Sequence, residues 1–258
     1  MLTVHHLGKS QSERGVWLCE ELGLDYELVR YARDLVTVLA PPELKALHPM
    51  GSAPLITDGG PVLAESGAIV EYILAKYGDG RLVIAPEAPE FADYLHWFHF
   101  ANGTLQLPMS RCFYLRRLNL AADNPILLAA EGRRERAFRY VDERLTAVPY
   151  LAGDVFTAAD IMTAFSLTTM RTFVPVELAR YSGILVYLQR IGGRKAYRGA
   201  KEKGDPGFPP MVGLIARTLH GRVSAPRSRG RWFPMRCGGK LVRDPRWCRS
   251  PQTHYQWR

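Results

Sequence analysis

Several features are missing from the 258-residue sequence, and each absence excludes a class of protein. No apolar run approaches the roughly 18 residues that cross a bilayer. The start, MLTVHHLGKS, lacks the basic segment and apolar stretch of a secretory signal. Only four cysteines are present, without the CxxC spacing of metal sites. Few, scattered cysteines are typical of a reducing compartment, so we expect a cytoplasmic protein that does not engage a membrane.

Acidic residues are almost absent from the end of the chain. Residues 211–258 contain 11 Lys and Arg but one acid, Asp244, whereas residues 1–210 contain 23 basic and 24 acidic side chains. The net charge of +9 therefore belongs to the end of the chain. Helical and strand periodicity also stops after GDPGFPP at 204–210. The sequence thus predicts a nearly neutral body followed by a basic tail over 211–258.

Two interpretations of the tail remain open. Its basic residues and five aromatic residues have the composition of a nucleic-acid-binding segment, through phosphate contacts and base stacking. It contains no recognised nucleic-acid-binding module, however, and its Arg, Pro, Gly and Trp content is typical of a disordered or non-native extension. We favour the extension, and a nucleic-acid partner is not expected.

Strand and helix patterns alternate through the first 80 residues. Helical spacing occurs before Gly23, in the short segment ELKAL at 43–47, and from Ser66 to Tyr77. Strand patterns lie between these helices at 2–7, 26–31, 54–58 and 61–64. The predicted order is β-α-β-α-β-β-α.

Strand patterns disappear after a Pro-punctuated connector. Helical patterns occupy about 91–118, 124–147, 157–171, 176–191 and 193–203. Thr157-Ala-Ala-Asp160 resembles a capping box, in which Asp160 bonds back to the start of its helix. We therefore predict a mixed α/β domain at 1–80, a linker at 81–89 and an all-helical domain at 90–205.

Four stretches resemble the cytosolic glutathione S-transferases, especially the bacterial and fungal members that begin VHHL…SRSxRxxWLLEEL. The corresponding stretch here is VHHLGKSQSERGVWLCEELGL. The family pattern HPxGKVPxL…ExxAIxxYL appears as HPMGSAPLITDGGPVLAESGAIVEYI, and WMHYAEGSLMPP as WFHFANGTLQLP. The ending RPAYRRALEKGDP appears as GGRKAYRGAKEKGDP. The resemblance covers about residues 1–205 and implies a thioredoxin-like first domain.

The same resemblance implies where glutathione would bind. The peptide bond before Pro54 would be cis, and Ala53 would offer its main-chain N–H and C=O to the cysteinyl part of the tripeptide. Ser66, in the first turn of a helix, would receive the γ-glutamyl carboxylate. Glu65 would orient the ammonium group. Pro54 alone could simply begin a strand, and Ser66 alone could simply be a helix N-cap.

Two serines are candidates for the residue that stabilises the glutathione thiolate. Both Ser10 and Ser12 lie between the first strand and the first helix. The family spacing SxxxR favours Ser10, four residues before Arg14, whereas Ser12 is the better candidate for the N-cap of the helix. Neither serine is a nucleophile, because the attacking sulfur belongs to glutathione.

Three positions depart from the family pattern. Ser52 replaces a Lys that commonly meets the glycine carboxylate of glutathione, so this end of the tripeptide would be held more weakly. Asn102 replaces an acid that would meet the glutathione ammonium, within the chain or across a dimer interface. Gly199 replaces an Arg. Tyr114, in RCFYLRRL, falls near the family's hydrophobic pocket, although helical spacing alone also explains it as a packing residue.

The resemblance predicts a homodimeric glutathione transferase that joins the glutathione thiol to hydrophobic electrophiles, with peroxidase activity towards organic hydroperoxides as a variant. The alternative is a non-catalytic interaction scaffold on the same fold. No metal is expected, because neighbouring strand residues such as His5 and His6 point to opposite faces. The electrophile cannot be read from the sequence.

Overall fold

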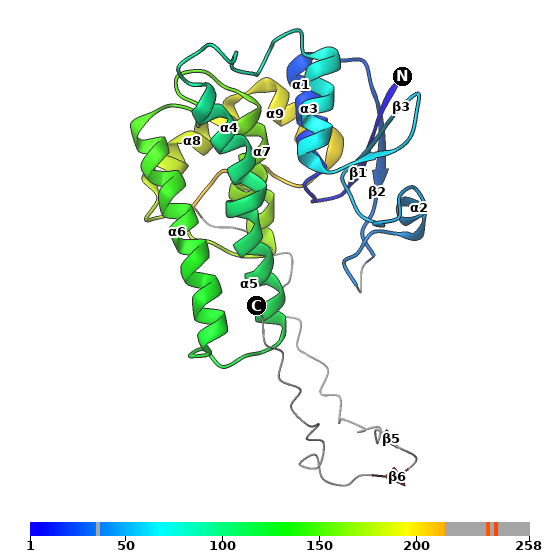
Figure 1. Cartoon of the computed structure of the whole chain (residues 1–258), viewed down its shortest axis with the longest axis vertical. Coiled ribbons are helices and arrows are strands. Elements are labelled where there is room, and N and C mark those ends of the chain that lie inside the picture. The colour runs from blue at the N-terminus through cyan, green and yellow to red at the C-terminus, as the bar shows by residue number, and fades with distance from the viewer. Residues whose placement is uncertain (35–36, 215–235, 238–239, 242–258) are drawn as a thin grey trace, which may run out of the picture. The chain divides into compact units, whose positions relative to one another are not determined.

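A computed structural model describes residues 1–34, 37–214, 236–237 and 240–241 (Figure 1). The chain forms two compact units, 1–219 and 220–258. In the second, β5 (Arg236–Cys237) pairs antiparallel with β6 (Lys240–Leu241), and the other residues of that unit lie outside the described part. The interpretations of the predicted tail therefore fall largely on residues that the structure does not describe.

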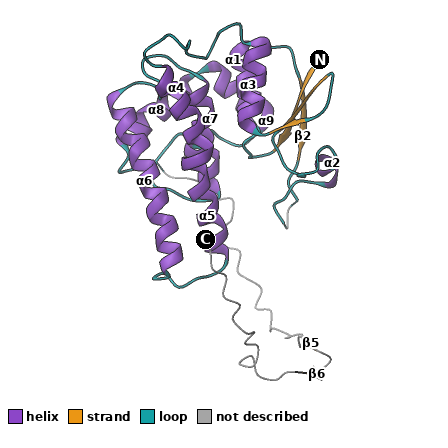
Figure 2. Ribbon diagram, in the orientation of Figure 1, coloured by secondary structure: helices purple, strands orange, loops and turns teal. Residues whose placement is uncertain are grey.

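A four-stranded mixed sheet forms the first half of unit 1–219 (Figure 2). Its spatial order is β2 (Glu27–Tyr31), β1 (Leu2–Leu7), β3 (Leu55–Asp58) and β4 (Leu63–Ala64). β1 runs parallel to β2 and antiparallel to β3, so the connection from β1 to β2 crosses over through a helix. The predicted order β-α-β-α-β-β-α is confirmed.

Strand alternation gives the sheet two apolar faces. Leu2 and Val4 pack in the main core with α1 (Glu13–Leu22) and α3 (Ser66–Tyr77). Leu7 points to the opposite face and packs with Leu44 of α2 (Pro42–Lys45). Figure 1 shows the strands between α2 and the α1–α3 pair. Successive side chains of a strand point to opposite faces, so β1 carries apolar residues at both even and odd positions, one set for each face of the sheet.

The second half of this unit is helical. It comprises α4 (Phe91–Phe100), a π-helical segment η1 (Ala101–Gln106), α5 (Leu107–Arg117), α6 (Pro125–Ala147), α7 (Ala158–Leu167), a short 3₁₀ segment η2 (Thr169–Thr172), α8 (Ser182–Gly193) and α9 (Lys195–Gly204). α9 returns to pack on α1, which ties the helical half to the sheet half. Within the described residues, no helix combines the length and hydropathy of a membrane span.

One helix start differs from the sequence prediction. The pattern predicted a helix from 176, but α8 begins at Ser182. The preceding segment is instead held by irregular contacts, because Arg171 donates from Nε to the Val176 carbonyl and Leu178 N–H donates to the Leu214 carbonyl. The first bond occupies the Val176 carbonyl, which a helix from 176 would use internally.

Arg171 also joins the start of the predicted tail to the body. This fully buried guanidinium donates to the carbonyls of Met211, Gly213 and Leu214, and Met211 itself is buried. The segment predicted as tail therefore overlaps the packed unit in its first four described residues, 211–214. The other predicted domain boundaries stay predictions.

The predicted capping box at the start of α7 is confirmed. The Asp160 carboxylate accepts hydrogen bonds from Thr157 N–H at 2.9 Å and from Leu151 N–H at 3.1 Å. Asp160 is fully buried, so water does not replace these bonds if the carboxylate is removed.

We predict that Asp160→Ala lowers the free energy of unfolding by about 2–4 kcal/mol, because it leaves two buried amide donors unpaired and removes a cap. Urea unfolding followed by circular dichroism measures the change. Glu202→Ala, an exposed substitution on α9, is the control. A loss no larger than that of the control would contradict the structural role of Asp160.

Candidate functional site

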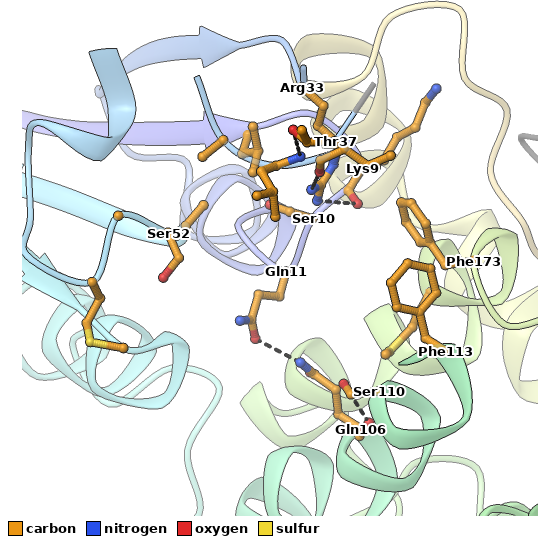
Figure 3. A pocket seen from close by; sticks show the side chains of 18 of the residues that line it. Lys9, Ser10, Gln11, Arg33, Thr37, Ser52, Gln106, Ser110, Phe113 and Phe173 are labelled. Atoms are coloured by element: carbon orange, nitrogen blue, oxygen red, sulfur yellow. Dashed lines mark hydrogen bonds between the residues drawn. The ribbon is translucent and has the colours of Figure 1, made fainter. Parts of the chain in front are cut away.

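A cavity of about 910 Å³ opens where the loop before α1 meets the helical half of the unit (Figure 3). Of the residues predicted for the site, Ser10, Ser52, Ala53 and Tyr114 line it. This volume lies within the range of small-molecule sites and leaves room for more than one ligand.

The two candidate serines have different surroundings. Ser10 lines the cavity, whereas Ser12 is fully buried behind it, with 2.7 Å between the two hydroxyl oxygens. Ser12 Oγ accepts a hydrogen bond from Leu7 N–H and lies 3.0 Å from Nδ1 of His6. Only Ser10 therefore combines access to the cavity with a position at the start of α1.

Ser12 occupies the N-cap position of α1, as predicted, but its side chain does not cap the helix. Its hydroxyl makes no hydrogen bond to the amides of the first turn. It faces back to the end of β1 instead, because Leu7 N–H and His6 provide nearer partners there. Ser10 Oγ accepts a hydrogen bond from Ser12 N–H at 3.2 Å.

The predicted main-chain site lies at the start of β3. The Ala53–Pro54 peptide bond is cis. The pairing of β3 with β4 begins at Leu55, so Ala53 lies beyond the ladder and beside the cavity. Ser52 is exposed next to it.

At the start of α3, Glu65 is exposed and adopts a positive φ of 70°. Ser66 is buried, and its hydroxyl accepts hydrogen bonds from Arg14 at 2.9 Å and from Asn102 at 3.0 Å. Ser66 thus lies against polar side chains of α1 and η1 within the same chain. Gln11 connects this cluster to the cavity, because it lines the cavity and its Oε1 lies 3.4 Å from Ser66 Oγ.

The sequence analysis missed the centre of this cluster. Arg14 is only 1% exposed, and its guanidinium donates to Gln11, Ser66, Asn102 and Gln106 over 2.8 to 3.0 Å. Every one of these partners is neutral. Burial lowers the pKa of Arg14 to about 9, although the neighbouring Glu13 opposes the shift.

Arg14 is therefore a buried cation whose hydrogen bonds all go to uncharged groups, which makes its surroundings favourable for an anion. The SxxxR spacing was the sequence signal for Arg14, but it served only to choose between Ser10 and Ser12. Burial of an arginine inside a helix–helix contact is not visible in spacing.

The cavity wall is positively charged. Its ionised lining residues among those described are Lys9, Arg33, Lys45 and Arg117, and the lining contains no carboxylate. Arg33 is held by the carbonyls of Gly8, Val38 and Lys9. Lys45 offers a cation near the position where Ser52 replaces the expected Lys, which the sequence analysis did not anticipate. Such a cavity attracts anionic ligands.

Aromatic residues form the wall across from Ser52, where Arg33 lies over the ring of Phe173 and Arg117 over that of Phe113. Phe113 of α5 and Phe173, which follows η2, make an edge-to-face contact with 6.1 Å between ring centroids. Figure 3 shows both rings across the cavity from Ser52, with Ser10 between. Tyr114 is 66% exposed at the rim. An apolar surface therefore faces Ser10 across the cavity.

Within the described ranges, no three His, Cys, Asp or Glu side chains gather closely enough to hold a metal ion.

The chain matches two family models, "Glutathione S-transferase, N-terminal domain" over residues 1–75 and "Glutathione S-transferase, C-terminal domain" over residues 104–195. It is 30% identical over 226 residues to Glutathione S-transferase 1 of Saccharomyces cerevisiae, covering 79% of this chain and 95% of the relative. It is 29% identical over 235 residues to Glutathione S-transferase 3 of Schizosaccharomyces pombe, covering 85% and 95%.

Among solved structures, a glutathione S-transferase from Actinobacillus pleuropneumoniae is 33% identical, with a TM-score of 0.73. The match covers 80% of this chain and 93% of that one.

We predict that Asn102→Asp stabilises the free protein by about 1–2 kcal/mol, because it gives the buried Arg14 an anionic partner in place of an amide oxygen. Arg14 Nη1 already lies 2.8 Å from Asn102 Oδ1, and the Ser66 hydroxyl can donate to the new carboxylate in place of accepting from the lost amide. Asn102→Ala should have the opposite effect. Urea unfolding without ligand measures both, and equal destabilisation by the two substitutions would contradict an unmet need for negative charge.

Proposed function

Because the chain belongs to the glutathione S-transferase family, we propose that this glutathione transferase uses Ser10 to activate the glutathione thiol for attack on an apolar electrophile. The observation that carries the proposal is the position of the Ser10 hydroxyl, which meets the cavity in the loop just before α1 while Ser12 lies behind it. The resemblance in sequence named the activity, and the geometry supports Ser10 over Ser12.

The γ-glutamyl end of glutathione would bind beside Ser66. The first amides of α3 and the helix dipole favour a carboxylate there. The buried Arg14 lies 2.9 Å from Ser66 Oγ and adds a full positive charge. Glu65, exposed just before α3, would face the ammonium group.

The rest of the tripeptide would extend across the cavity. Ala53, beyond the β3–β4 ladder, would pair its main-chain groups with the cysteinyl residue. Lys45 would meet the glycine carboxylate in place of the missing Lys at 52. Anchoring both ends through charges leaves the thiol between them, near Ser10.

Activation requires ionisation of the thiol. A free thiol has a pKa of about 8.5, so only a few per cent is thiolate at neutral pH. A hydrogen bond from Ser10, the start of α1 and the cationic wall all favour the anion. A decrease of about two pH units corresponds to about 2.7 kcal/mol of thiolate stabilisation.

The electrophile would bind against Phe113 and Phe173, because these rings supply an apolar surface opposite Ser10. Holding the electrophile there makes its reaction with the bound thiolate effectively unimolecular. Organic hydroperoxides belong in the same assay, since a thiolate also attacks a peroxide oxygen. The homodimer and the cytoplasmic location remain predictions of the sequence.

We predict that Ser10→Ala lowers the conjugation rate at neutral pH by up to about 25-fold, the change in thiolate fraction at pH 7 if the pKa of the bound thiol returns from about 6.5 to about 8.5. Glutathione affinity should change by only about a few-fold, because the tripeptide's ends are held elsewhere. Stopped-flow assays with aryl halides, combined with calorimetry, separate the two effects.

Ser110→Ala is the matched control. Ser110 also lines the cavity, but its hydroxyl donates to the Gln106 carbonyl of its own helical run. This substitution should lower the rate far less than Ser10→Ala. A wild-type protein that binds glutathione but conjugates no member of a broad electrophile panel would instead indicate a non-catalytic scaffold.

A further inference from the structure

We propose that His6 is a positioning residue whose Nδ1–H sets the direction of a hydrogen-bond chain and thereby aims the Ser10 proton at the glutathione sulfur. The inference rests on the proposed function. It concerns a buried ring that lies behind the serine pair and has no part in holding the tripeptide.

The chain consists of four side chains in line. Ser10 Oγ lies 2.7 Å from Ser12 Oγ, which lies 3.0 Å from His6 Nδ1. On the other side of the ring, Nε2 lies 3.3 Å from Oδ1 of Asp205, just after α9. All four residues are buried, Ser12 and His6 almost completely. Gly204 gives the ring its space, since a Cβ there would lie 3.2 Å from Nε2.

The hydroxyl of Ser12 has one proton and two acceptor positions. Leu7 N–H occupies one acceptor position at 3.1 Å. The proton and the remaining acceptor position are then shared between Ser10 and His6. The Leu7 carbonyl, at 3.4 Å, is the weaker competitor for the proton. If His6 donates to Ser12, then Ser10 accepts from Ser12. If His6 accepts from Ser12, then Ser10 donates to Ser12.

If Nδ1 of His6 carries a proton, it donates to Ser12. Ser12 then donates to Ser10, whose oxygen also accepts from Ser12 N–H at 3.2 Å. Both acceptor positions of Ser10 are filled from behind. Its own proton is left to point into the cavity, where it can donate to a thiolate.

If Nδ1 is bare, the chain reverses. Ser12 donates to His6, and Ser10 donates to Ser12. Ser10 then presents a lone pair to the cavity, which repels a thiolate instead of stabilising it. The protonation state of one nitrogen, two hydroxyls away, decides whether Ser10 can act.

Asp205 determines which protonation state supports the active direction. Its carboxylate faces Nε2, so a proton on Nε2 is favoured and a bare Nε2 is disfavoured. A neutral ring therefore keeps its single proton on Nε2 and leaves Nδ1 bare. Only the doubly protonated ring satisfies both Asp205 and the active direction of the chain.

The other charged groups near His6 lie around Asp205 and on β2. Asp205 also accepts from Lys9 N–H at 2.8 Å and lies 3.4 Å from Lys201 Nζ, which is itself paired with Glu13 of α1. On β2 the residue in register with His6 is Arg30, which is exposed.

Burial raises the pKa of Asp205, but the His6 ring 3.3 Å away, the charge of Lys201 and the Lys9 N–H outweigh burial and bring it to about 2. Asp205 is therefore an anion throughout the relevant pH range.

The direct test is nuclear magnetic resonance of the glutathione-bound protein with isotope-labelled histidine. We expect both ring nitrogens of His6 to be protonated at each pH where the bound sulfur is a thiolate and the enzyme is active. A bare Nδ1 under these conditions would overturn the proposal. The wild-type protein suffices, so the result does not depend on whether a variant folds.

The kinetic test is the pH dependence of the conjugation rate at saturating glutathione. In the wild type the rate should rise as the bound thiol ionises. His6→Asn and Ser12→Ala both break the chain, so the pH at which the rate reaches half its maximum should rise by about one unit in each, a loss of about tenfold at lower pH. An unchanged profile in both variants would overturn the proposal.

His5→Asn is the matched control. His5 is the preceding residue on β1 and points to the other face, with Nδ1 3.1 Å from the Tyr31 hydroxyl. Its pH profile should match that of the wild type, and an equal shift of the profile in this variant would contradict the proposed route through His6. Absence of any glutathione conjugation in the wild type would count against the proposed function, whereas conjugation with an unchanged profile in His6→Asn counts against His6 alone.

Discussion

Burial of the polar residues between β1 and α1 is the constraint on which the rest of the site depends. Ser10, Ser12 and Arg14 are each at most 5% exposed, so the hydrogen bonds of the two hydroxyls and of Arg14 Nη1 and Nη2 go to fixed protein groups. Packing of α1 against the sheet, α3, α7 and α9 causes this burial. As a consequence, the hydroxyl groups of the serines point in fixed directions. Each hydroxyl has few possible partners, and one of those directions faces the cavity.

Two kinds of electrostatics meet at this point. Arg14 supplies a buried positive charge without an anionic partner among its hydrogen bonds, which suits a carboxylate at the start of α3. The serine chain supplies a single directed dipole, which suits a sulfur anion. The charge provides attraction over several ångströms, and the dipole acts only in contact. In the proposed function, Arg14 would hold the tripeptide and the serine chain would activate it.

Much of the fold could be predicted from periodicity and from punctuation by Gly and Pro. Ser66 to Tyr77 and the capping box at Thr157 are local patterns, and local patterns determined those elements. The start of α8 could not be predicted, because Arg171 and residues 211–214 hold the preceding segment through long-range bonds. Within the site, Ser10 followed from a motif. The roles of Arg14, His6 and Asp205 did not, since each depends on contacts between elements that are distant in sequence.

The central claim is that the cavity binds glutathione with its sulfur ionised. Titration of the wild-type protein with reduced glutathione near pH 7, followed by the ultraviolet absorbance of the thiolate, tests this claim most directly. The account predicts that most of the bound tripeptide is thiolate at a pH where only a few per cent of the free thiol is ionised. Saturable binding without thiolate absorbance, or no binding at millimolar glutathione, would contradict it.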